Sequence, residues 1–191
     1  MTKRRTILFI RHGKTAGNRE KRYIGRTDEP LCEAGIKELR EMDYPPADLI
    51  VCSPLRRCLQ TAAILYPWQS VVTHAGLREC DFGDFEGRNY RELNGNPAYQ
   101  QWIDSGGRLP FPNGEAHGDF LSRCGAAFSE ISMKYRQDFA TAAFIIHGGS
   151  IMAILEQFAL PRRNFYEYQI DNGHGFVTEF DGETLTVLSR F

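Results

Sequence analysis

The sequence has no excess of charge of either sign: 23 Lys and Arg residues face 24 Asp and Glu residues, and the formal net charge is −1. Binding to nucleic acid or to an anionic membrane surface draws on an excess of basic residues. No apolar run exceeds five residues, whereas a membrane-spanning helix needs about 20. We therefore expect neither nucleic acid nor a membrane as a partner, and a cationic site would have to be local.

Cysteines are few and follow no pattern. They are Cys32, Cys52, Cys58, Cys80 and Cys124. Their number is odd and no Cys-x-x-Cys pair occurs, which argues against a disulfide framework and against a zinc knuckle. The basic N-terminal stretch 1–10 contains only four consecutive apolar residues, too few for the core of a signal peptide. The sequence therefore predicts a reduced, cytoplasmic protein.

A metal-binding pattern is also missing. His74, His117 and His174 are scattered, with no H-x-x-x-H pairing that would place two histidine ligands on one metal. We expect no metal site.

The chain does contain enough apolar sequence for one folded domain. Its 191 residues are 42% hydrophobic and 12% aromatic, which predicts a single domain over residues 1–191 with a sizeable core. Apolar runs predict strands at 7–10, 48–52, 70–74 and 142–146, and later strands at 166–170, 176–180 and 184–188. Helical spacing predicts helices at 33–42, 54–66, 116–136 and 151–158, the second of them capped by Ser53 and opened by Pro54.

Strands that alternate with helices predict an α/β fold, a three-layer αβα sandwich around a mostly parallel mixed sheet. The segment 77–115 differs, because it is rich in Gly, Asn, Pro and aromatic residues, with one helix predicted around 91–104. We interpret this segment as an excursion over the site. Ligands of such folds bind beyond the carboxyl ends of the strands.

Polar side chains follow three of the predicted strands. They are Arg11-His12-Gly13, Ser53-Pro54-Leu55-Arg56-Arg57 and His147-Gly148-Gly149. In a parallel sheet these segments meet at one rim, where two histidines join arginines and the N-termini of two helices. Helix N-termini and guanidinium groups both bind anions. The sequence predicts a cationic pocket for a phosphate dianion.

Residues 13–15, Gly-Lys-Thr, raise a nucleotide-binding alternative. A Walker A loop has glycine five positions before its Gly-Lys-Ser/Thr end, and this chain has Leu8 there, inside a predicted strand. We therefore favour His12 as a nucleophile over a phosphate-cradling loop. A neutral imidazole can accept a phosphoryl group, and neighbouring arginines disfavour its protonated form.

Such a reaction also needs an acid that protonates the leaving oxygen. Glu79 is the candidate, with Asp81, Asp84 and Glu86 as nearby alternatives that spacing alone does not separate. A carboxyl group beside a bound phosphate dianion has a raised pKa and can donate a proton. For each of these carboxylates, solvation of a loop is the competing interpretation.

Four segments carry a resemblance to a known family. They are Arg11-His12-Gly13-x-Thr15-x-x-Asn18, Ser53-Pro54-Leu55-x-Arg57-x-x-Gln60-Thr61-Ala62, Leu77-x-Glu79-x-x-Phe82-Gly83-x-x-Glu86-Gly87 and His147-Gly148-Gly149. Together they resemble the histidine phosphatase superfamily, with its phosphoglycerate mutase-like fold, over nearly the whole chain. The chain departs from the family pattern at Lys14, where Glu or Gln is usual.

The resemblance implies roles for these residues. His12 would be the phosphorylated nucleophile, Glu79 the proton donor, and Arg57 rather than Arg56 the phosphate ligand. It implies no metal and no organic cofactor. The implied catalytic residues are His12, Glu79, Arg11, Arg57 and His147, and the implied substrate- and phosphate-binding residues are Arg11, His12, Asn18, Gly25, Arg57, Glu79, His147 and Gly148.

The substrate is predicted by resemblance to one branch. The segments Tyr23-x-Gly25-x-Thr27-Asp28-x-Pro30-Leu31 and Pro112-Asn113-Gly114-Glu115 resemble the alpha-ribazole phosphatases of cobalamin biosynthesis, which remove the 5′-phosphate of a benzimidazole riboside. Aromatic residues of the excursion could receive the benzimidazole or could only pack the excursion onto the sheet. They are Tyr90, Tyr99, Trp102 and Phe111.

Three alternatives remain open at this point. One is a phosphatase of broad specificity. Another is a phosphoglycerate mutase, which we disfavour because the excursion offers only Arg91 and Arg108 as further basic groups between residues 90 and 115. The last is a non-catalytic phospholigand-binding module, which would need neither His12 nor Glu79. The sequence leaves a homodimer open.

Overall fold

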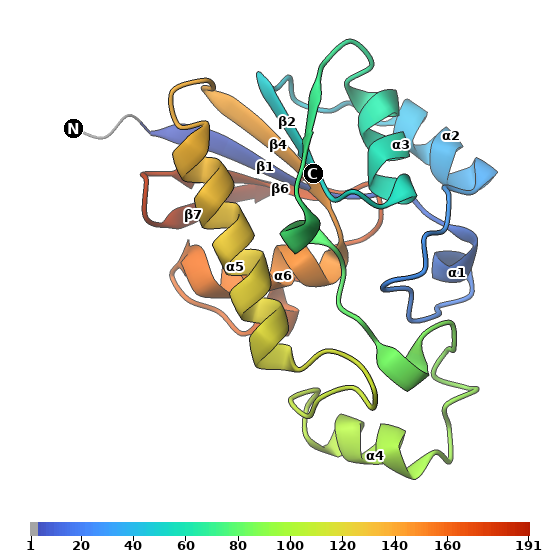
Figure 1. Cartoon of the computed structure of the whole chain (residues 1–191). Coiled ribbons are helices and arrows are strands. Elements are labelled where there is room, and N and C mark those ends of the chain that lie inside the picture. The colour runs from blue at the N-terminus through green and yellow to red at the C-terminus, as the bar shows by residue number, and fades with distance from the viewer. Residues whose placement is uncertain (1–3) are drawn as a thin grey trace.

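A mixed β-sheet forms the centre of the protein. The computed structural model describes residues 4–191, so residues 1–3 of the basic N-terminal stretch lie outside the described part. Within it, seven strands follow the order β3-β2-β4-β1-β6-β7-β5 (Figure 1). The strands are β1 (Arg5–Arg11), β2 (Leu49–Cys52), β3 (Val71–Thr73), β4 (Thr141–Ile146), β5 (Ala159–Leu160), β6 (Gly175–Phe180) and β7 (Leu185–Arg190).

The half of the sheet that carries the site is parallel. β3, β2, β4 and β1 are paired in parallel, whereas β6 is antiparallel to both β1 and β7. In this register Ile145 lies opposite both Ile10 and Cys52. β1, β2 and β4 therefore end at the same level, which brings the segments after them to one rim. The predicted mixed, mostly parallel sheet is confirmed.

Helices cover both faces of the sheet and make three layers (Figure 1). α5 (His117–Lys134) and α6 (Gly148–Phe158) lie on one face, and α2 (Glu33–Glu41) and α3 (Arg56–Leu65) lie on the other. The side chains of β1 alternate between two cores: Ile7 and Phe9 pack with α5 and α6, while Leu8 and Ile10 pack with α3. Apolar residues on both faces explain why these strands read as continuous apolar runs.

The predicted strand at 166–170 is wrong. This segment contains a 3₁₀ helix, η3 (Phe165–Tyr168). A capping box stabilises it, because Asn164 and Glu167 each accept a backbone N–H of the other. The edge position of the sheet is taken by the unpredicted β5.

Two predicted helices begin later than expected, and one short helix is additional. α3 begins at Arg56 rather than at residue 54, with Leu55 as its N-terminal cap residue. The Ser53 hydroxyl accepts the N–H of Leu55 and also hydrogen-bonds to the side chain of His147. α4 (Pro97–Asp104) begins six residues after the predicted start, where Asn96 accepts the N–H groups of residues 98 and 99. The predicted loop 11–18 contains α1 (Ala16–Arg19).

The excursion 77–115 lies at one end of the molecule, with α4 at its tip (Figure 1). Its aromatic side chains pack on one another: the Tyr99 and Trp102 rings stack at 6.2 Å, and the Trp102 and Phe111 centroids are 5.0 Å apart. Trp102 and Phe111 are buried in the core. Tyr90 remains exposed beside Arg91. These contacts favour the packing interpretation for three of the four candidate aromatic residues.

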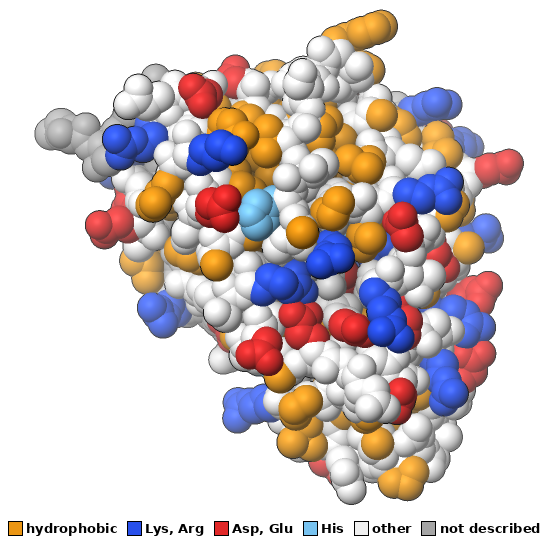
Figure 2. All heavy atoms as spheres, viewed as in Figure 1, with side chains coloured by type: hydrophobic (Ala, Val, Ile, Leu, Met, Phe, Trp, Pro, Cys, Tyr) orange, Lys and Arg blue, Asp and Glu red, His pale blue; other side chains and the backbone are white. Residues whose placement is uncertain are grey.

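The surface carries both charges. On the face shown in Figure 2, basic and acidic side chains are intermingled, and hydrophobic side chains gather in its upper part. This face therefore presents no extended area of one sign. Among the helices of residues 4–191, none has the length and apolar character required to cross a membrane.

Candidate active site

His12 lies directly after β1 and is only 3% exposed. Its main-chain N–H donates to the carbonyl of Ile146, which ties the end of β1 to the end of β4. Its Nδ1 lies 2.7 Å from the carbonyl oxygen of Gly13. Because a carbonyl only accepts, Nδ1 carries the proton, and the neutral ring has its free lone pair on Nε2.

The pKa of His12 lies well below its usual value. Burial is the main cause, and the positive charges of Arg57 and Arg11 add to it, while the hydrogen bond to Gly13 opposes the shift. The imidazole is therefore neutral near pH 7. The site holds the form of histidine that can act as a nucleophile.

Arg57, on the first turn of α3, is 1% exposed and reaches across the site. Its Nε donates to Nδ1 of His147 at 3.2 Å. Its Nη1 and Nη2 donate to the carbonyl oxygens of Thr27, at 2.7 Å, and Gly25, at 2.8 Å. Arg56 is exposed instead. Of these two arginines, Arg57 therefore lies in the pocket and Arg56 lies at the surface.

His147 follows β4 and is completely buried. Because its Nδ1 accepts from Arg57, its Nε2 carries the proton and donates to Ser53 Oγ at 2.8 Å. Its ring lies 5.1 Å from that of His12, edge to face. The predicted convergence of the segments around residues 12, 57 and 147 is confirmed by these contacts.

Arg11 lies against the N-terminus of α6. Its Nη1 donates to the carbonyl of Ile170 at 2.7 Å, while its Nε is buried with no hydrogen-bond partner. A Cβ on residue 148 would lie 3.3 Å from this Nε, so Gly148 lets the guanidinium approach the helix. A buried unpaired N–H is costly, and a bound anion would satisfy it.

Glu79 comes from the excursion and meets the same helix end. Its two carboxylate oxygens accept the N–H groups of Gly149 and Cys80, each at 3.0 Å. Burial raises the pKa of Glu79, and these hydrogen bonds and the charges of Arg57 and Arg11 partly offset the rise. The same two arginines act on His12, so the nucleophile candidate and the acid candidate share one pocket.

The other three carboxylates that sequence left as alternatives to Glu79 have structural partners. Asp81 accepts the N–H of Gly83 at 2.9 Å, and Asp84 accepts the side-chain amide of Asn113 at 3.0 Å. Both therefore order the excursion.

Glu86 supports the pocket indirectly. Its Oε1 accepts the N–H groups of Gly25, at 2.9 Å, and Thr27, at 3.0 Å. These two residues supply the carbonyl oxygens that hold Arg57. Gly25 thus contacts Arg57 through its backbone, and Glu86 fixes the loop that positions the arginine.

Asn18 and Lys14 both follow His12 and have different partners. Asn18 Oδ1 accepts the N–H of Thr15 at 3.2 Å and the side-chain amide of Asn172 at 3.1 Å. Lys14 instead pairs with Glu38 at 2.8 Å. Asn172 was missed by the sequence analysis, because it lies some 150 residues from Asn18 along the chain and belongs to none of the four motif segments.

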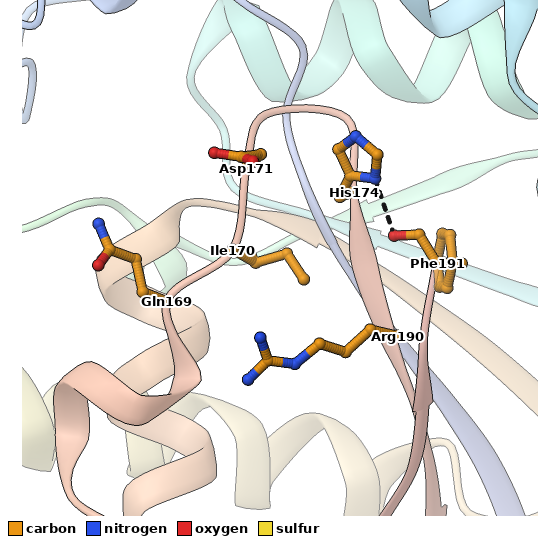
Figure 3. A pocket seen from close by; sticks show the side chains of 6 residues that line it. All are labelled: Gln169, Ile170, Asp171, His174, Arg190 and Phe191. Carbon is orange, nitrogen blue, oxygen red and sulfur yellow. Dashed lines mark hydrogen bonds between the residues drawn. The ribbon is translucent and has the colours of Figure 1, made fainter.

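Two hollows of about 480 Å³ each lie beside the histidine pair rather than at it. Figure 3 shows the first, lined by Gln169, Ile170, Asp171, His174, Arg190 and Phe191. The second is lined by Lys14, Glu38, Glu41, Met42, Asp171, Asn172 and His174. The segment 169–174 separates them, so both border the loop that wraps the turn at residues 11 and 12.

No group of three or more His, Cys, Asp or Glu side chains within residues 4–191 is arranged to hold a metal ion. The five cysteines are unpaired. The groups that converge at the rim are two guanidinium groups, two histidine rings, the N-terminus of α6 and one carboxyl group, and the cations and the helix end suit an anion. Chemically, the arrangement can bind a phosphoryl group, attack it with a neutral imidazole nitrogen and protonate a leaving oxygen.

A model of the histidine phosphatase superfamily (branch 1) matches residues 7–191. The chain belongs to this superfamily. This histidine phosphatase is 26% identical over 176 residues to the adenosylcobalamin/alpha-ribazole phosphatase of Salmonella typhimurium, which covers 87% of this chain and 86% of the relative. It is 30% identical over 161 residues to a 2,3-bisphosphoglycerate-dependent phosphoglycerate mutase of Gloeobacter violaceus, across 78% of this chain and 73% of that one.

Solved structures agree with the fold. The alpha-ribazole phosphatase of Shigella flexneri superposes with a TM-score of 0.82 at 24% identity, over 96% of this chain and 94% of that one. The predicted phosphoglycerate mutase-like architecture is therefore confirmed. The protein is a phosphatase. Relatives of similar sequence identity are named for different substrates, so these names do not identify the substrate of this chain.

Proposed function

We propose that this phosphatase hydrolyses a small phosphomonoester, without a metal or an organic cofactor, through a phosphohistidine formed on Nε2 of His12. The observation that carries the proposal is the hydrogen bond from His12 Nδ1 to the Gly13 carbonyl, which leaves Nε2 unprotonated. The partly buried Arg11 and the buried Arg57 supply charge for the phosphoryl oxygens. His147, Asn18 and the N-terminus of α6 at Gly148 complete the proposed phosphate site.

The reaction then has two steps. In the first, a bond forms between Nε2 of His12 and phosphorus while the ester P–O bond breaks, and the Glu79 carboxyl group gives its proton to the leaving oxygen. In the second, water attacks phosphorus, the Glu79 carboxylate takes the water's proton, and the P–N bond breaks to release phosphate. The raised pKa of Glu79 favours the protonated form that the first step requires.

For the substrate we propose alpha-ribazole 5′-phosphate, in cobalamin biosynthesis. The support comes from the resemblance of segments 23–31 and 112–115 and from the names of the Salmonella typhimurium and Shigella flexneri relatives. The packed aromatic residues of the excursion add no support, because Tyr99, Trp102 and Phe111 are engaged with one another. The proposed location is the cytoplasm, where the five unpaired cysteines stay reduced.

Two experiments test these proposals separately. Mixing the enzyme with a ³²P-labelled phosphomonoester and quenching in alkali should trap a labelled phosphohistidine that is absent from the His12→Ala variant. A wild-type enzyme that hydrolyses the ester without ever becoming labelled would contradict the role of His12 as the nucleophile. A panel of phosphometabolites tests the substrate. We expect kcat/KM for alpha-ribazole 5′-phosphate to exceed that of every other ester by roughly 100-fold or more, about 3 kcal/mol.

The panel also separates the alternatives. Comparable kcat/KM values for many esters would show a phosphatase of broad specificity, and phosphoryl transfer between phosphoglycerates faster than hydrolysis would show a mutase. Phosphate binding with no turnover of any ester, p-nitrophenyl phosphate included, would show a phospholigand-binding module.

A further inference from the structure

Asn172 lies in the turn between η3 and β6 and contacts the loop of the candidate nucleophile. Its Nδ2 lies 3.0 Å from the carbonyl oxygen of His12 and 3.1 Å from Oδ1 of Asn18. An amide NH₂ group has two hydrogens, and each of them has one acceptor here. A single side chain therefore joins the residue proposed to be phosphorylated to a residue proposed to bind the phosphate.

The identity of the neighbouring atoms fixes the orientation of both amides. The His12 carbonyl accepts only, so the atom of Asn172 beside it is nitrogen. The Thr15 N–H, 3.2 Å from Asn18, donates only, so the atom of Asn18 beside it is oxygen. Thr15 Oγ1 in turn accepts the N–H of Asn18. Two independent donors, Thr15 and Asn172, thus hold Asn18 Oδ1.

This arrangement leaves the amide nitrogen of Asn18 without a partner among the described side chains and backbone groups, while its oxygen is doubly bonded. Rotation of the amide by 180° would place two NH₂ groups face to face and would break both bonds. Asn18 is therefore held as a hydrogen-bond donor toward whatever occupies the far side of its amide.

The surroundings of Asn172 separate this role from a packing role. Asn172 is partly exposed and lines the second hollow, of about 480 Å³. Its backbone neighbour Gly173 already holds the turn, because the Gly173 N–H donates to the carbonyl oxygens of Arg11 and His12. Removal of the Asn172 side chain thus leaves the turn anchored and creates no enclosed cavity.

We infer that Asn172 is a positioning residue for phosphoryl transfer: it orients Asn18 so that the Asn18 amide donates to the phosphoryl group. The inference rests on the proposed phosphate-binding role of Asn18. Asn172 touches neither the phosphoryl group nor the leaving group and acts through Asn18.

A double-mutant cycle tests it. The variants are Asn18→Ala, Asn172→Ala and the double variant, with Asn164→Ala as the matched control, since Asn164 caps the neighbouring η3 and has no bond to Asn18. The readouts are kcat and KM for p-nitrophenyl phosphate and the Kd of inorganic phosphate. Loss of a hydrogen bond to a charged group predicts a fall in kcat/KM of roughly 10- to 100-fold for Asn18→Ala.

For Asn172→Ala we expect a fall in kcat/KM of about 5- to 10-fold, the effect of one neutral hydrogen bond. The double variant should be no worse than Asn18→Ala within about twofold, because residues that act as one unit are not additive. Asn164→Ala should match the wild type. Two results would overturn the inference. One is a fall in kcat/KM of the double variant that equals the product of the two single falls, and the other is wild-type kcat/KM for Asn172→Ala.

A second variant covers a failure of the alanine protein to fold. Asn172→Asp has the same shape but cannot donate, so it must weaken phosphate binding at least as much; wild-type affinity in this variant overturns the inference. The phosphate Kd also keeps the two proposals distinct. If the wild type binds phosphate but hydrolyses no ester, the proposed reaction is refuted, and the double-mutant cycle measured through the phosphate Kd still tests the role of Asn172. If the wild type binds no phosphate, both proposals are refuted.

Discussion

Gly149→Ala removes the proposed acid from its place without altering any group that takes part in the chemistry. Gly149 lies in the first turn of α6, and its N–H donates to Glu79 at 3.0 Å. A Cβ at this position would overlap Oε1 of Glu79. The carboxyl group is the free end of a flexible side chain, so it would swing away from the helix while the backbone stays in place.

The magnitude follows from what is lost and what is kept. A displacement of about 1 Å of a catalytic group costs on the order of 10²-fold, and general acid catalysis contributes about 10²- to 10⁴-fold. We therefore expect kcat/KM for an alkyl phosphate to fall roughly 100-fold. For p-nitrophenyl phosphate the fall should be below about tenfold, because p-nitrophenolate leaves without needing a proton.

Stability should change little in the same variant. Alanine is favoured over glycine in a helix by about 1 kcal/mol, and the lost hydrogen bond to a charged group costs about 1.5–3 kcal/mol. The free energy of unfolding should thus stay within about 2 kcal/mol of wild type. Gly118→Ala is the matched control, because Gly118 is also in the first turns of a helix and a Cβ there meets no atom within 4 Å.

The assay compares kcat/KM for the two esters, since this constant reports the step that breaks the ester bond, and follows unfolding in urea. Wild-type activity of Gly149→Ala on the alkyl ester would refute the placement of Glu79 as acid. An equal loss on both esters would refute its role as a proton donor. An inactive Gly118→Ala enzyme would show that helix starts tolerate no methyl group, and the comparison would fail.

Three further outcomes follow from the structure. Glu86→Ala removes the acceptor of two backbone N–H groups beside Arg57, so phosphate binding measured by calorimetry should weaken about tenfold; unchanged affinity would exclude a positioning role for Glu86. Stability should fall as the pH drops below about 6.5, because the pKa values of His12 and His147 are lowered in the folded state and the unfolded chain takes up these protons first. Glu79, with its raised pKa, opposes this trend, and His12→Asn should flatten it in thermal unfolding between about pH 7 and 5. Turnover should be the same with and without EDTA, since every proposed step uses side chains; loss that added Zn²⁺ or Mg²⁺ restores would contradict the proposal.

Local sequence patterns predicted most of the fold, because strands that are buried on both faces of a parallel sheet are continuous apolar runs in the sequence. Residues 7–10 of β1, 49–52 of β2 and 142–146 of β4 are all apolar. The segment 166–170 was wrongly predicted to be a strand, because aromatic residues are frequent in strands. There the reciprocal hydrogen bonds of Asn164 and Glu167 produced a 3₁₀ helix instead.

The sequence by itself determined which segments meet. Parallel strands of matched length place the residues after them on one rim, so the meeting of His12, His147 and the segment 53–57 was predictable from position, and the family motifs selected Arg57 over Arg56. Only the tertiary structure decided how these groups act. The proton on His12 Nδ1 depends on a carbonyl oxygen that the folded turn brings within 2.7 Å.

The family motifs had already selected Glu79, but the partners of the four carboxylates, and the contact between Asn172 and Asn18, likewise needed the folded chain. Glu79 differs from its neighbours because Gly149, 70 residues later in the first turn of α6, donates its backbone N–H to it. Asn172 reaches Asn18 across 154 residues of sequence. Hydrophobic periodicity specifies which face of an element is buried, but it contains no information about which polar groups of distant segments meet, since that depends on how the buried faces pack together.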